Sequence, residues 1–297
     1  MMTTVTKATV AFIGLGTMGF PMAGHLSQQG YQVVVYNRTD ATAKKWLAKY
    51  QGKQAFSPAE AASQAEVILT CVGNDQDLQQ VYLGDQGIVG AAKPGSTLVD
   101  HTTASAEIAR ELESAAKAHQ LEFLDAPVSG GEAGAVNGCL TVMVGGEQST
   151  LSKVAAVIDC YAKAVNLIGP AGYGQRCKMV NQLCITGILQ GLSEALKLAD
   201  AAKLDINKVV EVLQHGAAGS WQLSNRASSM TANEFDFGFA IDWMRKDLAI
   251  CFDEADKLGV ALPLAKQVDN EYAKLQQRGY ARADTSVLIK QFDDEQR

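Results

Sequence analysis

The sequence predicts an α/β protein in which a doubly wound, mainly parallel sheet domain is followed by an all-helical domain. In the first half of the chain, short β-rich runs alternate with helical patterns, which is typical of βαβ units. Several of these runs are almost wholly apolar, as expected for parallel strands that helices cover on both faces. After residue 169 the patterns are helical, without a convincing strand run. We therefore expect one domain over residues 1–169 and a helical domain over residues 170–297.

The expected elements follow from these patterns in chain order. Strands are expected at residues 9–14, 32–36, 66–72, 96–100, 122–128, 140–146 and 164–169. Helices are expected between them at residues 17–30, 40–50, 75–83, 104–119 and 147–160. The second domain opens with a long helix that runs to about Leu204. Its apolar residues are too many for one stripe, so we expect burial on several sides, as the spine of that domain or as part of a subunit interface.

The composition limits the class of protein. The chain has 297 residues, of which 47% are apolar, so it can bury a sizeable core in one large or two medium domains. Its net charge of −6 and its lack of a basic patch argue against nucleic acid as a partner. No apolar run reaches the roughly 18 residues that span a bilayer, so we expect no membrane contact. The N-terminus lacks the pattern of a signal peptide, and a cytoplasmic protein is expected.

The cysteines and histidines show no metal-binding pattern. The six cysteines form no CxxC pair and are expected to be reduced thiols in the core and not a set of disulfides. The four histidines are scattered along the chain without the spacing of metal ligands. We therefore expect no metal in the site.

A glycine-rich motif follows the first expected strand. The stretch FIGLGTMGFPMAGHL places Gly14, Gly16 and Gly19 as GxGxxG between an apolar strand and a helix. Gly14 permits the tight turn, Gly16 lets the backbone approach a pyrophosphate, and Gly19 lets the helix pack closely on the strand. The helix N-terminus adds amide donors and a partial positive charge. The motif predicts a dinucleotide site that includes Leu15, Thr17 and Met18; a glycine-rich turn without a ligand is the alternative.

The stretch VVVYNRTD bears on the choice of coenzyme. Asn37 lies 23 residues after Gly14, where the second strand ends and an acidic residue would bind the ribose of NAD. Arg38 can instead form paired, charge-assisted hydrogen bonds with a 2′-phosphate, and Asn37 and Thr39 can add neutral ones. We predict NADPH over NADH, with Asp40 capping the next helix. The alternative is that Arg38 stacks on adenine in solvent and that both coenzymes bind.

Two further groups of residues suggest chemistry. Lys178 lies early in the long helix, with Asn181 and Gln182 on the same face at i+3 and i+4. A lysine on a mostly apolar helix is costly unless its ammonium reaches solvent or has a chemical role, and both alternatives are open. In PVSGG, Ser129 and the amides of Gly130 and Gly131 can bind an anion such as a substrate carboxylate, or form a plain tight turn.

Four separated motifs resemble those of the β-hydroxyacid dehydrogenase family. They are GLGTMGFPMAGHL (14–26), DAPVSGGEAGAVNGCLTVMVGG (125–146), GYGQRCKMVNQ (172–182) and RKDLAI (245–250). The resemblance covers nearly the whole chain. It implies a Rossmann-type domain followed by an all-helical domain, with the active site in the cleft between them. It also implies a homodimer or homotetramer.

The resemblance assigns roles to residues of these motifs. Lys178 would protonate the carbonyl oxygen as hydride arrives, or accept that proton in reverse, while Asn181 would orient the lysine or the substrate oxygen. The substrate would be bound by Ser129, Gly130, Gly131 and Gln182. Lys246 would reach the nicotinamide end of the coenzyme, although by its sequence alone it could form a solvated turn with Asp242. The remaining coenzyme contacts would come from Val72, Gly73, Asp77 and Thr103.

The segment 215–230 has two interpretations. Trp221 and Ser220 could line the cleft and Arg226 could meet a substrate acid, or the segment could be a helix–helix connection with a buried Trp. Trp243 and Phe239 are expected in the core.

Together these features predict an NADPH-dependent reductase of a small aldehyde or keto acid that carries a carboxylate, with glyoxylate and succinic or methylmalonate semialdehyde as the expected substrates. The first alternative is an NAD(P)-dependent 3-hydroxyisobutyrate-type dehydrogenase that acts oxidatively. Imine reductases share the expected architecture but typically lack a lysine at the position of Lys178. An alternative of another class is a non-catalytic nucleotide-binding protein.

Overall fold

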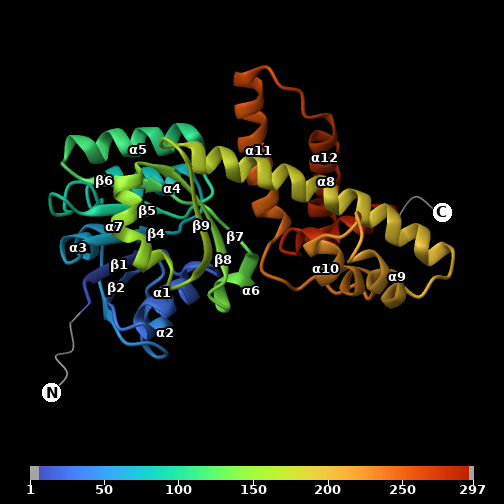
Figure 1. Cartoon of the computed structure of the whole chain (residues 1–297), viewed down its shortest axis with the longest axis horizontal. Coiled ribbons are helices and arrows are strands. Elements are labelled where there is room, and N and C mark those ends of the chain that lie inside the picture. The colour runs from blue at the N-terminus through green and yellow to red at the C-terminus, as the bar shows by residue number, and fades with distance from the viewer. Residues whose placement is uncertain (1–6, 294–297) are drawn as a thin grey trace. The chain divides into compact units, whose positions relative to one another are not determined.

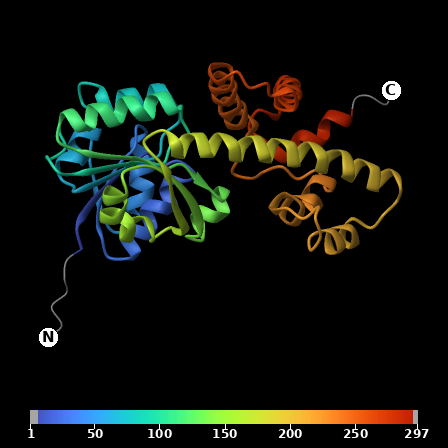
Figure 2. The ribbon, with the colours of Figure 1, turned by 45° about the horizontal axis from the view of Figure 1, so that its top comes forward.

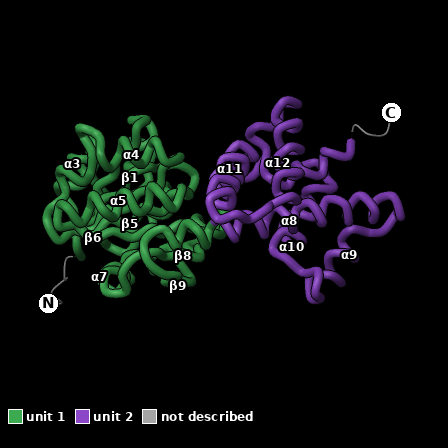
Figure 3. Tube along the Cα trace, turned by 90° about the horizontal axis from the view of Figure 1, so that it is seen from above, with its two compact units in different colours: residues 1–178 green, residues 179–297 purple. Residues whose placement is uncertain are grey.

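The computed structural model describes residues 7–293, and the chain divides into two compact units, Met1–Lys178 and Met179–Arg297 (Figure 3). The division falls inside one long helix, α8 (Tyr173–Ala201), whose first residues belong to unit 1. The sequence predicts the second domain from residue 170, ahead of this helix. The first turn of α8 stays with unit 1 because the Asp125 carboxylate accepts hydrogen bonds from the backbone amides of Gly172 and Gln175.

Unit 1 is built on one mainly parallel sheet. Among residues 7–293, nine strands form it in the order β3-β2-β1-β4-β5-β6-β8-β7, and β9 pairs with β8. Neighbours from β3 to β6 are parallel, whereas β8 runs antiparallel to β6 and β7. The strands are Thr9–Ile13 (β1), Gln32–Tyr36 (β2), Lys53–Gln54 (β3), Val67–Thr70 (β4), Thr97–Asp100 (β5), Glu122–Asp125 (β6), Val128–Ser129 (β7), Leu140–Gly146 (β8) and Ala162–Gly169 (β9).

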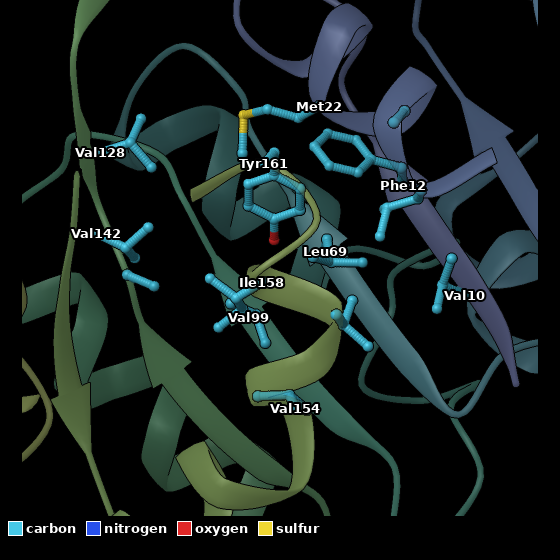
Figure 4. Packing of buried hydrophobic residues seen from close by; sticks show 14 of the residues in the cluster. Val10, Phe12, Met22, Leu69, Val99, Val128, Val142, Val154, Ile158 and Tyr161 are labelled. Carbon is cyan, nitrogen blue, oxygen red and sulfur yellow. The ribbon is translucent and has the colours of Figure 1, made fainter. Parts of the chain in front are cut away.

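Helices cover both faces of this sheet (Figure 1). Strand residues alternate between two cores, so that Val10 and Phe12 face one core and Ala11 and Ile13 the other. Figure 4 shows the first core, in which Tyr161 lies among apolar side chains. This core includes residues of Gly19–Gln28 (α1), Asp40–Leu47 (α2), Gly131–Val136 (α6) and Gln148–Ile158 (α7). The second includes residues of Pro58–Ser63 (α3), Asp75–Leu83 (α4) and Ala106–Ala118 (α5). The predicted fold class of this domain, a Rossmann-type sheet, is confirmed.

Some short elements differ from the sequence prediction. The expected strand 122–128 is two strands, because β6 pairs with β5 and β8 whereas β7 pairs with β8. Pro127, which has no amide hydrogen, lies between them. The two-residue β3 and the six-residue α3 and α6 were not predicted, because elements this short carry too little hydrophobic periodicity to be recognised.

The prediction that Asp40 caps the following helix is wrong. The N-cap of α2 is Thr39, which makes no side-chain cap hydrogen bond, and Asp40 is the first helical residue. The Asp40 carboxylate pairs with Lys44 at 2.6 Å and accepts a hydrogen bond from Gln54. An acid in the first turn still favours the helix through its macrodipole.

Helices and the loops between them make up the described part of unit 2, as predicted, with one isolated antiparallel bridge between Ala240 and Asp284. After α8 come Ile206–Leu213 (α9), Trp221–Thr231 (α10), Ile241–Leu258 (α11), Pro263–Leu275 (α12), a π-helical turn at Gln276–Tyr280 and a 3₁₀ helix at Thr285–Phe292. Figure 2 shows α8 running between α11 and α12 on one side and α9 and α10 on the other. Leu189 of α8 accordingly packs in a core with α11 and α12, and Leu196 in a core with α10.

Within one chain, the long helix α8 packs against two cores of unit 2 and keeps one apolar face exposed. Leu189 and Leu196 are buried, but Val180 is 61% exposed and Leu198 is 72% exposed. The expected burial on several sides therefore holds toward both cores of unit 2, while one apolar face of the helix stays in solvent in the single chain. No helix within residues 7–293 is long and apolar enough to cross a membrane.

Candidate active site

Three glycines shape the loop between β1 and α1. Gly14 has φ +95°, and a Cβ there would collide with the carbonyl oxygen of Cys71. A Cβ at Gly19 would collide with the carbonyl oxygen of Gly14, so α1 starts directly against the loop. Around the position of a Gly16 Cβ, no described atom lies within 4 Å. The loop combines a tight turn, an open backbone and close helix packing, and the pyrophosphate of NAD(P) fits it.

The three residues after β2 play different parts. Asn37 is turned toward the protein, because its Oδ1 accepts the Leu15 amide at 2.9 Å and its Nδ2 donates to the Thr39 carbonyl at 3.1 Å. Asn37 thus holds the glycine-rich loop through Oδ1 and its own turn after β2 through Nδ2. The Arg38 side chain is 84% exposed, and its Nη1 forms an ion pair with Asp77 Oδ1 at 3.0 Å. Arg38 is therefore the residue that presents a charged donor at this edge.

A buried polar network orders the loops after β4 and β5. Asp100 Oδ1 accepts hydrogen bonds from Thr70 Oγ1 at 2.7 Å and from the Thr102 amide at 3.1 Å. The Thr102 hydroxyl in turn accepts the Val72 amide at 3.0 Å. Burial raises the pKa of Asp100 to about 7. Through these bonds Asp100 joins the loop of Val72 to the loop of Thr103, two of the predicted coenzyme contacts.

The other predicted coenzyme residues of unit 1 lie at the same carboxyl edge of the sheet. Leu15, Thr17 and Met18 lie between β1 and α1, and Gly73 lies between β4 and α4. Beside them, His101 is a structural residue. Its Nδ1 donates to the Ala126 carbonyl and its Nε2 accepts from the Tyr161 hydroxyl, while burial lowers its pKa to about 4.

The turn after β7 has a backbone that only glycine adopts easily. Ser129 ends β7, and Gly130 and Gly131 follow with φ of +136° and +61°. The Gly134 amide donates to the Gly130 carbonyl and starts α6. Around the position of a Gly131 Cβ, no described atom lies within 4 Å, so a small group can approach the turn from that side.

Lys178 lies on a firmly held part of α8. Gln175, one turn earlier, accepts the Ala104 amide with Oε1 at 3.0 Å and donates from Nε2 to the Thr102 carbonyl at 2.8 Å. Its own amide donates to the buried Asp125 carboxylate, whose pKa is raised by burial. Lys178 is 7% exposed. A lysine whose ammonium extends into solvent would be more exposed, so this burial favours a chemical role.

In unit 2, one network connects the predicted residues of α8 and α11. Asn181 Nδ2 donates to Gln182 Oε1 at 2.8 Å, and Gln182 Nε2 donates to Asp247 Oδ2 at 2.6 Å. Asp247 Oδ1 lies 3.0 Å from Lys246 Nζ, so Lys246 pairs with its chain neighbour. Gln182 is 1% exposed and holds the Asn181 amide, while its predicted contact with the substrate stays a prediction.

Segment 215–230 is engaged within unit 2. Arg226 pairs with Asp284 at 3.2 Å, and its guanidinium lies over the rings of Trp221 and Phe237. These contacts favour the helix-connection interpretation, although Trp221 is 50% exposed and not buried. The expectation that Trp243 lies in the core is wrong, because this residue is 40% exposed.

Sequence reasoning missed several residues that support these positions. They are Asp100, Asp125, Gln175 and Asp247, each at least 96% buried in hydrogen-bonded surroundings. The available signal was an acid at the end of an apolar strand, as in VD at 99–100 and LD at 124–125. Such an acid is costly to bury unless its oxygens are hydrogen-bonded, so it should point to a structural network.

The fold and the glycine-rich loop are those of dinucleotide-binding oxidoreductases. Comparisons with known proteins identify the family within this class. Residues 9–169 match the family described as the NAD binding domain of 6-phosphogluconate dehydrogenase. Residues 172–292 match the family described as the NAD-binding domain of NADP-dependent 3-hydroxyisobutyrate dehydrogenase.

Individual relatives agree with these matches over nearly full length. An uncharacterized oxidoreductase of Shewanella frigidimarina is 55% identical over 95% of this chain and 97% of the relative. An NAD-dependent L-serine dehydrogenase of Pseudomonas aeruginosa is 31% identical over 97% and 98% of the two chains. The solved structure of Mycobacterium tuberculosis 3-hydroxyisobutyrate dehydrogenase with L-serine has a TM-score of 0.86 at 30% identity, and the match covers 95% and 98% of the two chains.

The chain therefore belongs to the β-hydroxyacid dehydrogenase family, the NAD(P)-dependent oxidoreductases related to 3-hydroxyisobutyrate and serine dehydrogenases that act on CH–OH groups. The resemblance seen in the four sequence motifs is confirmed.

Proposed function

We propose that this protein is an NADPH-dependent reductase that converts a small aldehyde or keto acid, such as glyoxylate or a semialdehyde, into the hydroxy acid. The observation that carries the coenzyme choice is the exposed Arg38 guanidinium at the end of β2, where no carboxylate stands at residues 37–39. A guanidinium forms charge-assisted hydrogen bonds with a phosphate, whereas a carboxylate there would bind the ribose hydroxyl of NADH. NADH is expected to be the weaker coenzyme.

The residues of the chain supply orientation and the proton. NADPH, when bound, supplies the hydride. Lys178, buried one helical turn after Gln175, gives a proton from Nζ to the carbonyl oxygen of the substrate as that oxygen gains charge. Asn181, whose amide is held by Gln182, orients the substrate oxygen or the lysine. In the reverse direction, Lys178 accepts the proton from the hydroxyl group.

The substrate carboxylate has a proposed site in unit 1. Ser129 ends β7 beside two glycines whose positive φ angles turn the backbone sharply. A hydroxyl and the adjacent amides at such a turn suit an anion. The space beside Gly131 leaves room for the short carbon chain of a small carboxylic acid.

The test compares NADPH and NADH oxidation with a panel of small semialdehydes and keto acids. In the wild type, kcat/KM should favour NADPH, and Arg38→Gln should lower the NADPH-to-NADH ratio by about tenfold or more, the value of a charged hydrogen bond to phosphate. Lys45→Gln, which removes an exposed charge on α2, is the matched control and should leave the ratio as it is. Lys178→Ala should abolish turnover with both coenzymes.

Two outcomes would contradict the proposal. Equal use of both coenzymes, with no effect of Arg38→Gln, would exclude the phosphate role while leaving the chemistry standing. Turnover that survives in Lys178→Ala would exclude this lysine as the proton donor.

A second candidate function is the oxidation of a 3-hydroxy acid such as 3-hydroxyisobutyrate or L-serine. It is favoured by the likeness to two proteins whose names carry these substrates, at 30% and 31% identity. Oxidation assays with both hydroxy acids, using NAD⁺ and NADP⁺, distinguish it from the first candidate. A kcat/KM for oxidation above that of every aldehyde in the panel would favour this direction.

We also propose that the protein works as a homodimer or homotetramer. In the described chain, no residue of α9 is buried, and Val212 of this helix is 72% exposed. Leu198 of α8 is exposed to the same extent. Unit 2 thus keeps apolar side chains in solvent that a second copy can cover.

A further inference from the structure

The ion pair between Arg38 and Asp77 joins two parts of one sheet edge. Arg38 follows β2, and Asp77 lies in the first turn of α4, which follows β4. β1 lies between these strands in the sheet, and all three are parallel. Because parallel strands end at the same edge, the pair reaches across the side of the glycine-rich loop, where a bound dinucleotide has its adenosine half.

Asp77 is the firmly held member of this pair. Its backbone amide donates to Asn74 Oδ1 at 2.9 Å, and its carboxylate lies at the N-terminus of α4, which favours negative charge. Its side chain is 28% exposed, against 84% for Arg38. Among residues 7–293, Asp77 is the partner that holds the Arg38 guanidinium.

Among residues 37–39, directly after β2, Arg38 is the charged donor. The Asn37 amide is used by Leu15 and by the Thr39 carbonyl. A 2′-phosphate that binds here must therefore share Arg38 with Asp77 or displace it, and it meets a fixed negative charge beside its site. NADH carries a neutral hydroxyl at this position, so it neither competes with Asp77 for Arg38 nor is repelled by the Asp77 carboxylate.

We infer that Asp77 is a specificity-determining residue that limits the preference for NADPH by competing with the 2′-phosphate for Arg38. The inference rests on the proposed coenzyme role of Arg38. The Arg38 guanidinium thus attracts the 2′-phosphate, and the Asp77 carboxylate opposes its binding. The relative strength of these two interactions sets the ratio in which the protein uses NADPH and NADH.

The test is Asp77→Asn, which removes the charge but keeps the shape of the side chain and the backbone bond to Asn74. The ratio of kcat/KM for NADPH to that for NADH should rise about threefold to tenfold, the range that an exposed ion pair and one neighbouring charge supply. The rise should shrink at high salt, because the charges are exposed. Asp85→Asn, an equal charge change in the exposed segment after α4, is the control and should not change the ratio.

A double variant separates competition from general charge repulsion. In the Arg38→Gln background, Asp77→Asn should raise the ratio less than it does in the wild type, because only the repulsion between carboxylate and phosphate remains. Thermal unfolding of each variant shows whether the fold is kept.

The possible failures can be told apart. A ratio that falls in Asp77→Asn would show that Asp77 holds Arg38 ready for the phosphate, and would overturn the inference. An unchanged ratio in Asp77→Asn, together with a lowered ratio in Arg38→Gln, would overturn it while leaving the coenzyme role of Arg38 intact. An unchanged ratio in Arg38→Gln would overturn the proposed coenzyme choice, and the inference with it.

Discussion

The buried carboxylate of Asp100 shows how one residue can couple the candidate site to pH. It is 1% exposed and joins β4 to the loop after β5 through Thr70 and Thr102. Burial raises its pKa to about 7, far above the value of an aspartate in the unfolded chain. The folded protein therefore binds a proton that the unfolded chain has lost at the same pH.

This shift predicts that stability falls as pH rises through neutrality. A raised pKa in the folded state contributes stability that is present at low pH and is lost as pH rises through about 7. Between about pH 6 and pH 8 the free energy of unfolding should decrease by about 1 kcal/mol from this group. Urea unfolding of the wild type and of Asp100→Asn across this range measures the effect.

The variant Asp100→Asn should show a flatter pH profile, because its side chain carries no titrating proton. His101 acts in the opposite sense, since its lowered pKa of about 4 costs stability as pH falls below its unfolded value near 6.5. Because His101 is present in both proteins, the difference between the two pH profiles isolates the contribution of Asp100. Equal slopes for the wild type and the variant over the same pH range would contradict the assignment.

Pairs of helices depend on side chains buried between them, and α8 and α11 of unit 2 are joined in this way. Gln182 of α8 donates to Asp247 of α11 at 2.6 Å, and it also receives the Asn181 amide. Gln182 and Asp247 are 1% and 3% exposed. Removing either side chain would leave a buried polar group of the other with fewer partners.

A double-mutant cycle tests this link. Gln182→Leu and Asp247→Leu should each lower the free energy of unfolding by about 1–3 kcal/mol. The double variant should lose less than the sum, by about 0.5–3 kcal/mol, because the second change removes the group that the first left unpaired. As a control, Gln182→Leu combined with the exposed and unrelated Asp85→Asn should be additive. Additivity for Gln182 and Asp247 would show that they do not support each other.

For the molecule as a whole, the exposed apolar side chains of unit 2 predict an assembly of identical chains. The wild type should sediment at about two or four times the chain mass of 31.6 kDa. Leu198→Glu and Val212→Glu should shift it toward the monomer, since a charge buried at an interface is costly. Phe56→Glu, at a 74% exposed apolar site of unit 1, is the matched control. A wild type that sediments as a monomer would contradict the proposal.

Much of the fold and part of the candidate site follow from the sequence, because they depend on local patterns. Apolar runs that alternate with helical periods predict the parallel sheet, and GxGxxG predicts the turn at Gly14. The exposed Arg38 and the early position of Lys178 in α8 are also visible in the chain order. The short β3 and the exposure of Trp243 are not, because no local pattern distinguishes them from their neighbours, whereas the break after β6 was signalled by Pro127 and overlooked.

The sequence by itself determined the class of fold, the order of its elements and the chemical types present after β1, β2 and β7. The tertiary structure decided which side chains are free to act. Asn37 is used within the protein, Gln182 is buried, and Arg38 is paired with an acid 39 residues away. Asp100 and Asp125 bond residues 30 and 47 positions distant. Hydrogen bonds and ion pairs between distant residues exist only once the chain has folded, so their partners cannot be read from local periodicity.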